Sequence, residues 1–331
     1  MGAARDRGSQ RRAVDSLALI LSEEDVEDLL EMRDAVSSVE EVFRREAGGE
    51  AVNSPRTRAR APGIVLNSMQ AHLPYLGRSG LKCYMSSRKG TRFIFILFDS
   101  TDSRPLAIMG ADVLGRVRTG AASGVATKFL YGRRSAKLAV CGSGKQAMTQ
   151  VLGVAAVTSL SEVRVWSPIE EHRAGFAQKL RGVGLNAEMV ETPREALKGA
   201  DVASTITSSI EPFIEPYAVE HLSHLNVCGS NSPENAEVTA PTLGEFEAVV
   251  VDDLPQARIE YGDLIQAAEA GTFSWDAALQ LKDVVAGKVR VAAPTLFKSG
   301  GVAIEDVAVG SMVYDKALKS GRFPDATVDL A

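Results

Sequence analysis

The sequence has few of the residues that would point to a nucleic-acid-binding, membrane or disulfide-bonded protein. Its 37 basic residues are outnumbered by 42 acidic ones, so a net charge of −5 offers no basic surface to nucleic acid or anionic lipid. No apolar run approaches the ~20 residues needed to cross a bilayer. The three cysteines, Cys83, Cys141 and Cys228, are odd in number and form no CxxC pair, which favours reduced thiols in a cytoplasmic protein.

Histidine is also scarce, and its placement gives no sign of a metal centre. The four histidines, at positions 72, 172, 221 and 224, lack the spacing of metal ligands, so we expect no metal. His221 and His224 are three residues apart, and we expect both on a surface helix. The sequence also lacks a GxSxG elbow and a Ser/Lys dyad, which argues against the hydrolases that are built on them.

The 331 residues suffice for two domains, and their character changes near residue 120. We expect residues 1–13 to form a solvated tail. A strand at 16–21 should follow, and then a helix that begins after the Ser22 cap, runs to about residue 47 and breaks near 32–34. Residues 50–63 show no clear period. Strand-like runs at 64–69, 81–85 and 93–98, separated by turn residues, predict an antiparallel sheet in an α+β first region.

Beyond residue 120, strands and helices alternate. An alanine-rich helix at 121–130 precedes six predicted strands, at 137–141, 163–166, 187–190, 202–205, 225–228 and 248–251. Thr192-Pro193 marks one helix start well, as a cap followed by a first-turn proline. This alternation predicts an α/β fold, a Rossmann doubly wound parallel sheet. A glycine-rich stretch after Pro294 leads to a last helix at 305–319.

The first predicted strand of this second region runs directly into Gly142-Ser143-Gly144-Lys145-Gln146-Ala147. A GxGxxA pattern between a strand and a helix is typical of dinucleotide binding. Gly142 permits a tight turn, Gly144 lets the backbone approach the pyrophosphate, and Ala147 lets the helix pack closely on the strand. The N–H groups at the start of the helix can bind the phosphates. We therefore predict NAD or NADP as the cofactor.

The end of the second strand favours NADP. Proteins that bind NAD usually carry an acid there for the ribose 2′-hydroxyl. Here the strand ends in Ser167-Pro168, and the next acids are Glu170 and Glu171. No carboxylate at the strand end repels a 2′-phosphate, and Ser167, His172 and Arg173 offer partners for one. The alternative, that His172 and Arg173 lie on a solvated helix face, stays open.

Three cationic positions are candidates for substrate binding. Lys82 stands between Leu81 and Cys83 in an apolar strand, where an ammonium needs a carboxylate partner or a catalytic task. Arg118-Thr119 precedes the alanine-rich helix, and Arg56 lies upstream of both. Guanidinium groups match the geometry of carboxylates and phosphates. Taken singly, a pair such as Arg118-Thr119 is more often a helix cap and surface ion pair. Lys82 alone is better explained by a solvated face of its strand.

Several segments of the sequence, taken in their order along the chain, resemble the ornithine cyclodeaminase/mu-crystallin family. The resemblance covers about residues 15–320 and is much more specific than the glycine motif alone. The matching segments are Ser54-Pro55-Arg56, Gly80-Leu81-Lys82, Arg118 to Ala122, Gly142 to Ala147, Val227 to Pro233 and Phe297 to Gly301.

The resemblance implies an NAD(P)-dependent homodimer. Residues 121–301 would be the Rossmann domain, and residues 14–120 with 302–331 would bind substrate and dimerise. Arg56, Lys82 and Arg118 would line the substrate pocket, with the arginines on an α-carboxylate and Lys82 near the reacting carbon–nitrogen bond. The expected cofactor contacts are Arg118, Thr119, Gly142, Ser143, Gly144, Lys145, Gln146, Ser167, Thr205, Gly229, Ser230 and Lys298.

One position departs from the cyclodeaminases of that family. They carry an aspartate in a Gly-x-Asp-x-Pro segment, which handles protons at the reacting amine, whereas this chain has Asn231. An amide cannot act as a general base, although it can orient a substrate or cofactor. We therefore expect an oxidoreductase that acts on a small amino acid or its imine, with Lys82 and Asn231 as catalytic residues. The alternatives are a cyclodeaminase that converts ornithine to proline and ammonia with recycled NAD, and a non-catalytic, NADPH-binding crystallin-like protein.

Overall fold

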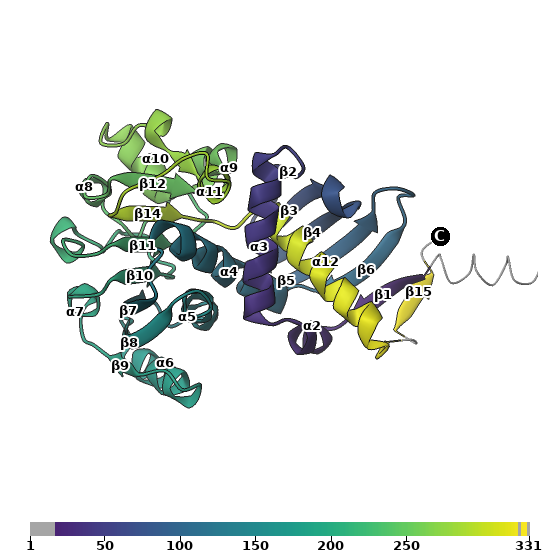
Figure 1. The fold of residues 1–331 in the computed structure, drawn as a ribbon, viewed down its shortest axis with the longest axis horizontal. Coiled ribbons are helices and arrows are strands. Elements are labelled where there is room, and N and C mark those ends of the chain that lie inside the picture. The colour runs from purple at the N-terminus through teal and green to yellow at the C-terminus, as the bar shows by residue number, and fades with distance from the viewer. Residues whose placement is uncertain (1–16, 324–325, 330–331) are drawn as a thin grey trace, which may run out of the picture. The chain divides into compact units, whose positions relative to one another are not determined.

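The computed structural model describes residues 17–323 and 326–329, and the chain divides into two compact units (Figure 1). The first unit combines the chain up to Glu31 with Gly48–Gly115 and the chain from Val302 onward. The second unit combines Met32–Ala47 with Arg116–Gly301. Helix α4 (Asp112–Leu130) begins in the first unit and continues in the second. The tail expected at 1–13 lies outside the described residues.

The first unit contains a seven-stranded sheet with a long helix along one face. The strands are ordered β15-β1-β6-β5-β4-β3-β2, and neighbours are antiparallel except for β1 and β6. Helix α12, yellow in Figure 1, packs on β2 to β5. The elements are β1 (Leu17–Leu21), α2 (Glu23–Leu29), β2 (Val52–Ala61), β3 (Ile64–Leu73), the 3₁₀ helix η1 (Pro74–Leu76), β4 (Arg78–Ser87), β5 (Gly90–Asp99), β6 (Pro105–Gly110), α12 (Ala303–Ser320) and β15 (Thr327–Asp329).

Two glycines let α12 approach this sheet closely. A Cβ on Gly80 would lie 2.8 Å from both Phe95 and Val307, and a Cβ on Gly310 would lie 2.3 Å from the Phe95 ring. The fully buried Phe95 fills the space that the two missing side chains leave. Because side chains alternate along a strand, Gly80 and Lys82 both face α12.

The second unit contains an eight-stranded sheet, ordered β13-β12-β14-β11-β10-β7-β8-β9, in which every pair is parallel. Its strands are β7 (Ser135–Cys141), β8 (Ser159–Trp166), β9 (Ala187–Met189), β10 (Val202–Thr205), β11 (His224–Val227), β12 (Ala248–Val251), β13 (Leu279–Gln280) and β14 (Thr295–Lys298). Its helices, besides α4, are α3 (Met32–Ala47), α5 (Ala147–Ala155), α6 (Glu170–Gly182), α7 (Pro193–Leu197), η2 (Pro216–Ala218), α8 (Ala240–Leu243), α9 (Leu254–Glu260), α10 (Gly262–Glu269), η3 (Trp275–Ala277) and α11 (Leu281–Val285). The predicted α/β fold with a doubly wound parallel sheet is confirmed.

Strand β2 occupies most of the stretch in which the sequence shows no period. Its register with β3 shifts between Ser54 and Thr57, and Pro55 lies within this irregularity. The proline is tolerated because β2 is the edge strand of its sheet, where a missing N–H breaks no ladder. The bulge destroys the two-residue alternation by which strands are recognised.

Helix α4 begins nine residues before the alanine-rich helix that the sequence predicts at 121, at Asp112. A carboxylate from α2 caps it: Asp112 N donates to Glu23 Oε1 at 2.8 Å and Val113 N donates to Glu23 Oε2 at 3.0 Å. This cap comes from 89 residues away, so no local pattern reveals it. Arg118 and Thr119 therefore lie within the helix and not before it.

Strand β14 and the position of His224 correct two further expectations. The sequence predicts six strands and treats the stretch after Pro294 as glycine-rich coil, but Thr295–Lys298 forms β14, between β11 and β12. His224 is not on a surface helix. It begins β11, and its side chain is fully buried.

A chain of polar contacts surrounds the His224 ring. Nδ1 lies 2.8 Å from Thr295 Oγ1, and Nε2 lies 3.1 Å from Asn226 Oδ1. The Asn226 amide in turn donates to Thr127 Oγ1 at 3.2 Å. These partners are neutral, and burial lowers the pKa of His224 to about 4.

We expect His224 to make the fold less stable in acid. An unfolded histidine titrates near pH 6.5, whereas His224 in the fold stays neutral down to about pH 4. Between these values only the unfolded chain takes up the proton, so the free energy of unfolding should fall by about 3 kcal/mol through this residue. Urea unfolding from pH 7 to pH 4 should show a shallower pH dependence for His224→Gln. Parallel curves for the two proteins would contradict the assignment.

Candidate functional site

The carboxyl ends of the parallel strands form one row across the sheet of the second unit. Strand pairing aligns Cys141 with Trp166 and Thr205, and it aligns Thr205 through Val227 with Lys298. The loops that follow these strands therefore start at the same edge. The strand order reverses between β7 and β10, and ligands bind open α/β sheets at such a reversal, beyond the carboxyl ends.

A cavity of about 420 Å³ opens at this reversal. Its lining includes the glycine loop Gly142–Gly144, the end of β8 at Trp166–Pro168, His172, the loop Ile206–Ser209 after β10, and Phe213. The Trp166 and Phe213 rings lie 5.2 Å apart, and none of the described lining residues is acidic. Backbone N–H groups, hydroxyls and aromatic rings together suit the phosphates, riboses and base of a nucleotide.

Gly142 and Gly144, the two glycines of the loop, differ in what surrounds them. Gly142 has φ of +124°, and a Cβ there would lie 2.4 Å from the carbonyl oxygen of Ile206. The protein itself therefore requires Gly142. A Cβ on Gly144 would meet nothing within 4 Å, so its surroundings are open to a ligand. Lys145 and Gln146 are exposed in the turn before α5, which begins at Ala147 as the motif predicts.

Hydrogen bonds hold the end of β8 in place. Ser143 Oγ donates to Ser167 Oγ at 2.9 Å, and Arg173 Nη1 donates to the carbonyl oxygen of Ser167 at 3.1 Å. His172 lines the cavity, and Arg173 is tied to the strand end. In proteins that bind NAD, an acid at the end of the second strand meets the ribose 2′-hydroxyl. At the end of β8, this protein presents hydroxyl and imidazole groups instead.

Glu237, a fully buried carboxylate that no sequence motif marks, joins the ends of β10 and β11. Glu237 Oε2 accepts from Thr205 Oγ1 at 2.7 Å and from Gly229 N at 2.9 Å. Oε1 accepts from the backbone N–H and the hydroxyl of Thr207, each at 2.7 Å. Thr205 and Gly229, both expected to contact cofactor, are thus bound to one carboxylate. Neither is among the residues that line the cavity.

Lys298 is wholly enclosed at the end of β14. Its ammonium lies 2.6 Å from Asp263, whose other oxygen accepts from Glu237 N at 2.6 Å and from Val238 N at 2.9 Å. Burial disfavours the ammonium, but the Asp263 and Glu237 carboxylates outweigh it and raise the pKa of Lys298 above its usual value. Lys298 is expected to contact cofactor, but it does not line the cavity.

The remaining predicted residues of the second unit lie in α4 and in the loop after β11. Arg118 and Thr119 are buried in α4, and the Arg118 guanidinium stands against Gly301, where a Cβ would lie 1.7 Å from Nη1. Ser230 is buried and Asn231 is half-buried in the loop after β11.

The first unit holds Arg56 and Lys82, both buried. Lys82 Nζ lies 2.7 Å from Asp306 Oδ1 in the first turn of α12, with side-chain exposures of 2% and 1%. The apolar strand around Lys82 predicts a carboxylate partner or a catalytic task. It cannot identify Asp306, which is 224 residues away. Removing one member of such a buried pair leaves the other charge uncompensated.

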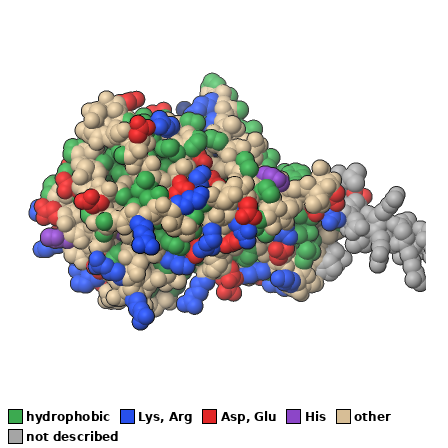
Figure 2. All heavy atoms as spheres, turned by 45° about the horizontal axis from the view of Figure 1, so that its top comes forward, with side chains coloured by type: hydrophobic (Ala, Val, Ile, Leu, Met, Phe, Trp, Pro, Cys, Tyr) green, Lys and Arg blue, Asp and Glu red, His purple; other side chains and the backbone are tan. Residues whose placement is uncertain are grey.

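Two of the three cysteines are deeply buried in the second unit. All three cysteines are free, and burial raises the pKa of Cys141 and raises that of Cys228 to about 12, which makes both poor nucleophiles. Within residues 17–323 and 326–329, no three His, Cys, Asp or Glu side chains are arranged to hold a metal ion. The same residues include no helix that is long and apolar enough to cross a membrane. Basic and acidic side chains are intermixed on the face shown in Figure 2.

Comparison with known proteins identifies the group to which these features belong. The model of the ornithine cyclodeaminase/mu-crystallin family matches residues 17–321. An alanine dehydrogenase from Archaeoglobus fulgidus is 33% identical over 313 residues, which cover 91% of this chain and 95% of that protein.

Two solved structures share the fold over almost their whole length. One is the Δ1-pyrroline-2-carboxylate reductase of Thermococcus litoralis in complex with NADH and L-proline. It has a TM-score of 0.86 and 29% identity, and the match covers 92% of this chain and 98% of that one. The other is an archaeal alanine dehydrogenase dimer with bound NAD. It has a TM-score of 0.87 and 30% identity, and the match covers 95% of this chain and 100% of that one.

The difference between the two loop glycines predicts how their variants behave. Gly144→Val places its side chain in open space, so we expect a folded protein that has lost most of its affinity for NADH and NADPH, because the branched side chain stands where the pyrophosphate should lie. Gly142→Ala should instead lower the melting temperature. Fluorescence titration with each cofactor and thermal melting separate the two effects. Unchanged cofactor affinity in Gly144→Val would show that the dinucleotide binds elsewhere.

Proposed function

The chain belongs to the ornithine cyclodeaminase/mu-crystallin family, and on this basis we propose that it is an NAD(P)-dependent oxidoreductase acting on a small amino acid or its imine. The observation that carries the proposal is the nucleotide-sized cavity at the strand-order reversal, with Gly144 open to a ligand. The similar structures with bound NADH or NAD, one of which also holds L-proline, support it. The dinucleotide belongs to the second unit and substrate binding to the first.

The cavity fits a nicotinamide dinucleotide, which when bound supplies or accepts the hydride. The chain's own part is to bind and orient it. The glycine loop leaves room for the pyrophosphate, the start of α5 offers N–H groups to it, and Trp166 and Phe213 offer faces to the base. We further propose a preference for NADP, because Ser167 and His172 offer hydrogen bonds to a 2′-phosphate and no lining carboxylate repels it.

The roles that the family resemblance implies for the cationic residues are proposals as well. Arg56 and Arg118 each offer a guanidinium for the α-carboxylate of the substrate. Lys82 passes a proton to or from the substrate nitrogen as the C=N bond is reduced or the amine oxidised. Asp306 holds the Lys82 ammonium in place. Asn231 orients substrate or cofactor through its amide.

The family resemblance also allows two other activities, and one observation counts against each. The family includes cyclodeaminases, which would release ammonia and proline from ornithine without net change in the cofactor. Asn231 disfavours that reaction, because an amide cannot take up the proton that the aspartate of those enzymes handles. A crystallin-like protein would bind NADPH and turn nothing over, but this chain retains Arg56, Lys82 and Arg118, the three cations that the resemblance places in a substrate pocket.

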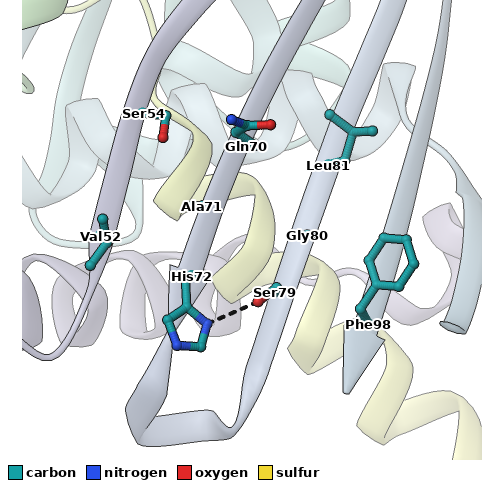
Figure 3. A pocket seen from close by; sticks show the side chains of 9 residues that line it. All are labelled: Val52, Ser54, Gln70, Ala71, His72, Ser79, Gly80, Leu81 and Phe98. Atoms are coloured by element: carbon teal, nitrogen blue, oxygen red, sulfur yellow. Dashed lines mark hydrogen bonds between the residues drawn. The ribbon is translucent and has the colours of Figure 1, made fainter. Parts of the chain in front are cut away.

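We also propose that the protein is a homodimer formed through the first unit. On the sheet face away from α12, the side chains of Leu66, Met85 and Ile94 are 43%, 48% and 42% exposed. The same face is hollowed by a cavity of about 420 Å³, whose lining includes Leu81 and Phe98, and Figure 3 shows His72 hydrogen-bonded to Ser79 there. Exposed apolar side chains gathered on one face of a sheet are typical of a protein–protein interface. The dimeric alanine dehydrogenase structure supports a second copy as its partner.

We expect the protein to oxidise NADPH, and NADH less efficiently, when supplied with cyclic imines or with small 2-oxo acids and ammonia. Absorbance of the reduced cofactor at 340 nm measures this directly. Lys82→Met should lower kcat by about 10²-fold or more, the usual scale for a positioned proton donor, and should barely change cofactor affinity. No turnover by the wild-type protein across the panel, or ammonia and proline release from ornithine without cofactor consumption, would contradict the oxidoreductase.

Two control variants for the lysine test change residues of α12, Asp306 and Lys316. Lys82→Met leaves Asp306 as an uncompensated buried charge, so Lys82→Met/Asp306→Asn should restore stability without restoring activity. Lys316→Met removes an ammonium that donates to the Leu29 carbonyl, and it should leave kcat near normal. Normal activity per folded molecule in Lys82→Met would show that the lysine is only structural.

The proposed interface predicts that charge on the apolar sheet face separates the subunits. Met85→Lys/Ile94→Lys places two ammonium groups where the partner should pack, so light scattering should give half the wild-type mass. Ile210→Lys, an equally drastic change at an exposed position of the second unit, should leave the dimer intact. A wild-type monomer, or a double variant that stays dimeric, would overturn this interface.

A further inference from the structure

We propose that Glu237 is a positioning residue for the dinucleotide: its carboxylate fixes the loop after β10 and thereby one wall of the cofactor cavity. The inference rests on the proposed cofactor binding. Glu237 is itself absent from the residues that line the cavity, so it acts through the groups that it binds.

The carboxylate of Glu237 accepts four hydrogen bonds within 2.9 Å from three residues at the ends of two neighbouring strands. Thr205 and Thr207 belong to the end of β10 and its loop, and Gly229 belongs to the loop after β11. Two of the four donors are backbone N–H groups just beyond the strand ends, where the ladders no longer supply acceptors. Glu237 therefore extends the pairing of β10 with β11 past the last strand residues.

Only a carboxylate satisfies all four donors. Each oxygen of Glu237 accepts one hydroxyl and one backbone N–H, from Thr205 and Gly229 at Oε2 and from Thr207 at Oε1. Glutamine has the same shape, but its NH₂ group must replace one oxygen. In either orientation this group faces a backbone N–H, and the loop loses an acceptor and gains a repulsion.

The loop that Glu237 holds forms part of the cavity wall. Thr207 lines the cavity, and its hydroxyl, which donates to Glu237, also accepts from Ser209 N at 3.2 Å. The preceding residue, Ile206, packs against the glycine loop: a Cβ on Gly142 would lie 2.4 Å from the Ile206 carbonyl oxygen. A shift of Thr207 would therefore move the wall and press on the glycine loop at once.

Behind Glu237, the buried pair of Asp263 and Lys298 anchors it. Asp263 accepts from the Glu237 N–H at 2.6 Å and lies 2.6 Å from Lys298 Nζ, at the carboxyl end of β14. Gly229 passes close to the carboxylate, because a Cβ there would lie 2.3 Å from Oε1. Lys298 and Gly229, expected from the sequence to contact cofactor, thus support the cavity wall through Glu237.

The test compares the dissociation constants of NADPH and NADH for the purified full chain and for Glu237→Gln. We expect a rise of about tenfold or more, with a matching rise in the KM for cofactor and a much smaller change in kcat. Thr205→Val removes one donor from Glu237 at a buried position outside the cavity, and it should shift the dissociation constant in the same direction by less.

The matched control is Thr295→Val. It removes a buried hydrogen bond to His224 at the amino ends of β11 and β14, opposite the strand ends that face the cavity. It should therefore lower the melting temperature and leave cofactor affinity unchanged. Wild-type cofactor affinity in Glu237→Gln, or in Thr205→Val if Glu237→Gln does not fold, would overturn the positioning role. An equal loss of affinity in Thr295→Val would overturn it too. A wild-type protein that binds neither cofactor would instead refute the proposed function on which the inference rests.

Discussion

The alignment of parallel strand ends is the constraint on which the second unit depends. In-register pairing brings the last residues of β8, β7, β10, β11, β14 and β12 to one edge, where each chain must turn and leave the ladder. Backbone groups just past that edge lose their partners, and a buried carboxylate, Glu237, supplies acceptors for two of them. The glycine loop lies at the same edge, and the open space beside Gly144 leaves room there for a ligand. One constraint thus produces both the binding site and the need to reinforce it.

Each unit contains a buried ion pair between a lysine and an aspartate. Lys82 pairs with Asp306 in the first unit, and Lys298 pairs with Asp263 in the second, each pair being almost or wholly inaccessible. Such pairs contribute little net stability, because desolvation cancels most of their attraction, but breaking one is costly. They therefore specify geometry more than they add stability. Lys298 shows what this geometry serves, since its partner Asp263 also holds the backbone of Glu237.

Local signals in the sequence were sufficient where the structure is local. The caps at Ser22 and Thr192 form as predicted, and so do the parallel α/β alternation and the GxGxxA turn. Features that depend on distant partners were not predictable. Helix α4 starts early because Glu23 caps it, β2 is irregular because of its bulge, and β14 is a strand because it lies between β11 and β12. Lys82 indicates that a buried carboxylate exists, but only the fold identifies Asp306.

The glycines at the candidate cofactor site also differ in whether the protein itself explains them. Gly142, Gly144 and Gly229 all carry the family resemblance, and a ligand could explain each of them. The structure shows that Gly142 is required by Ile206 and Gly229 by Glu237, whereas nothing in the protein occupies the space beside Gly144. A glycine that the protein already fills supports a site without touching the ligand. Because only an open glycine can leave room for a pyrophosphate, we place the proposed cofactor beside Gly144, and we infer that the other two glycines hold that place in shape.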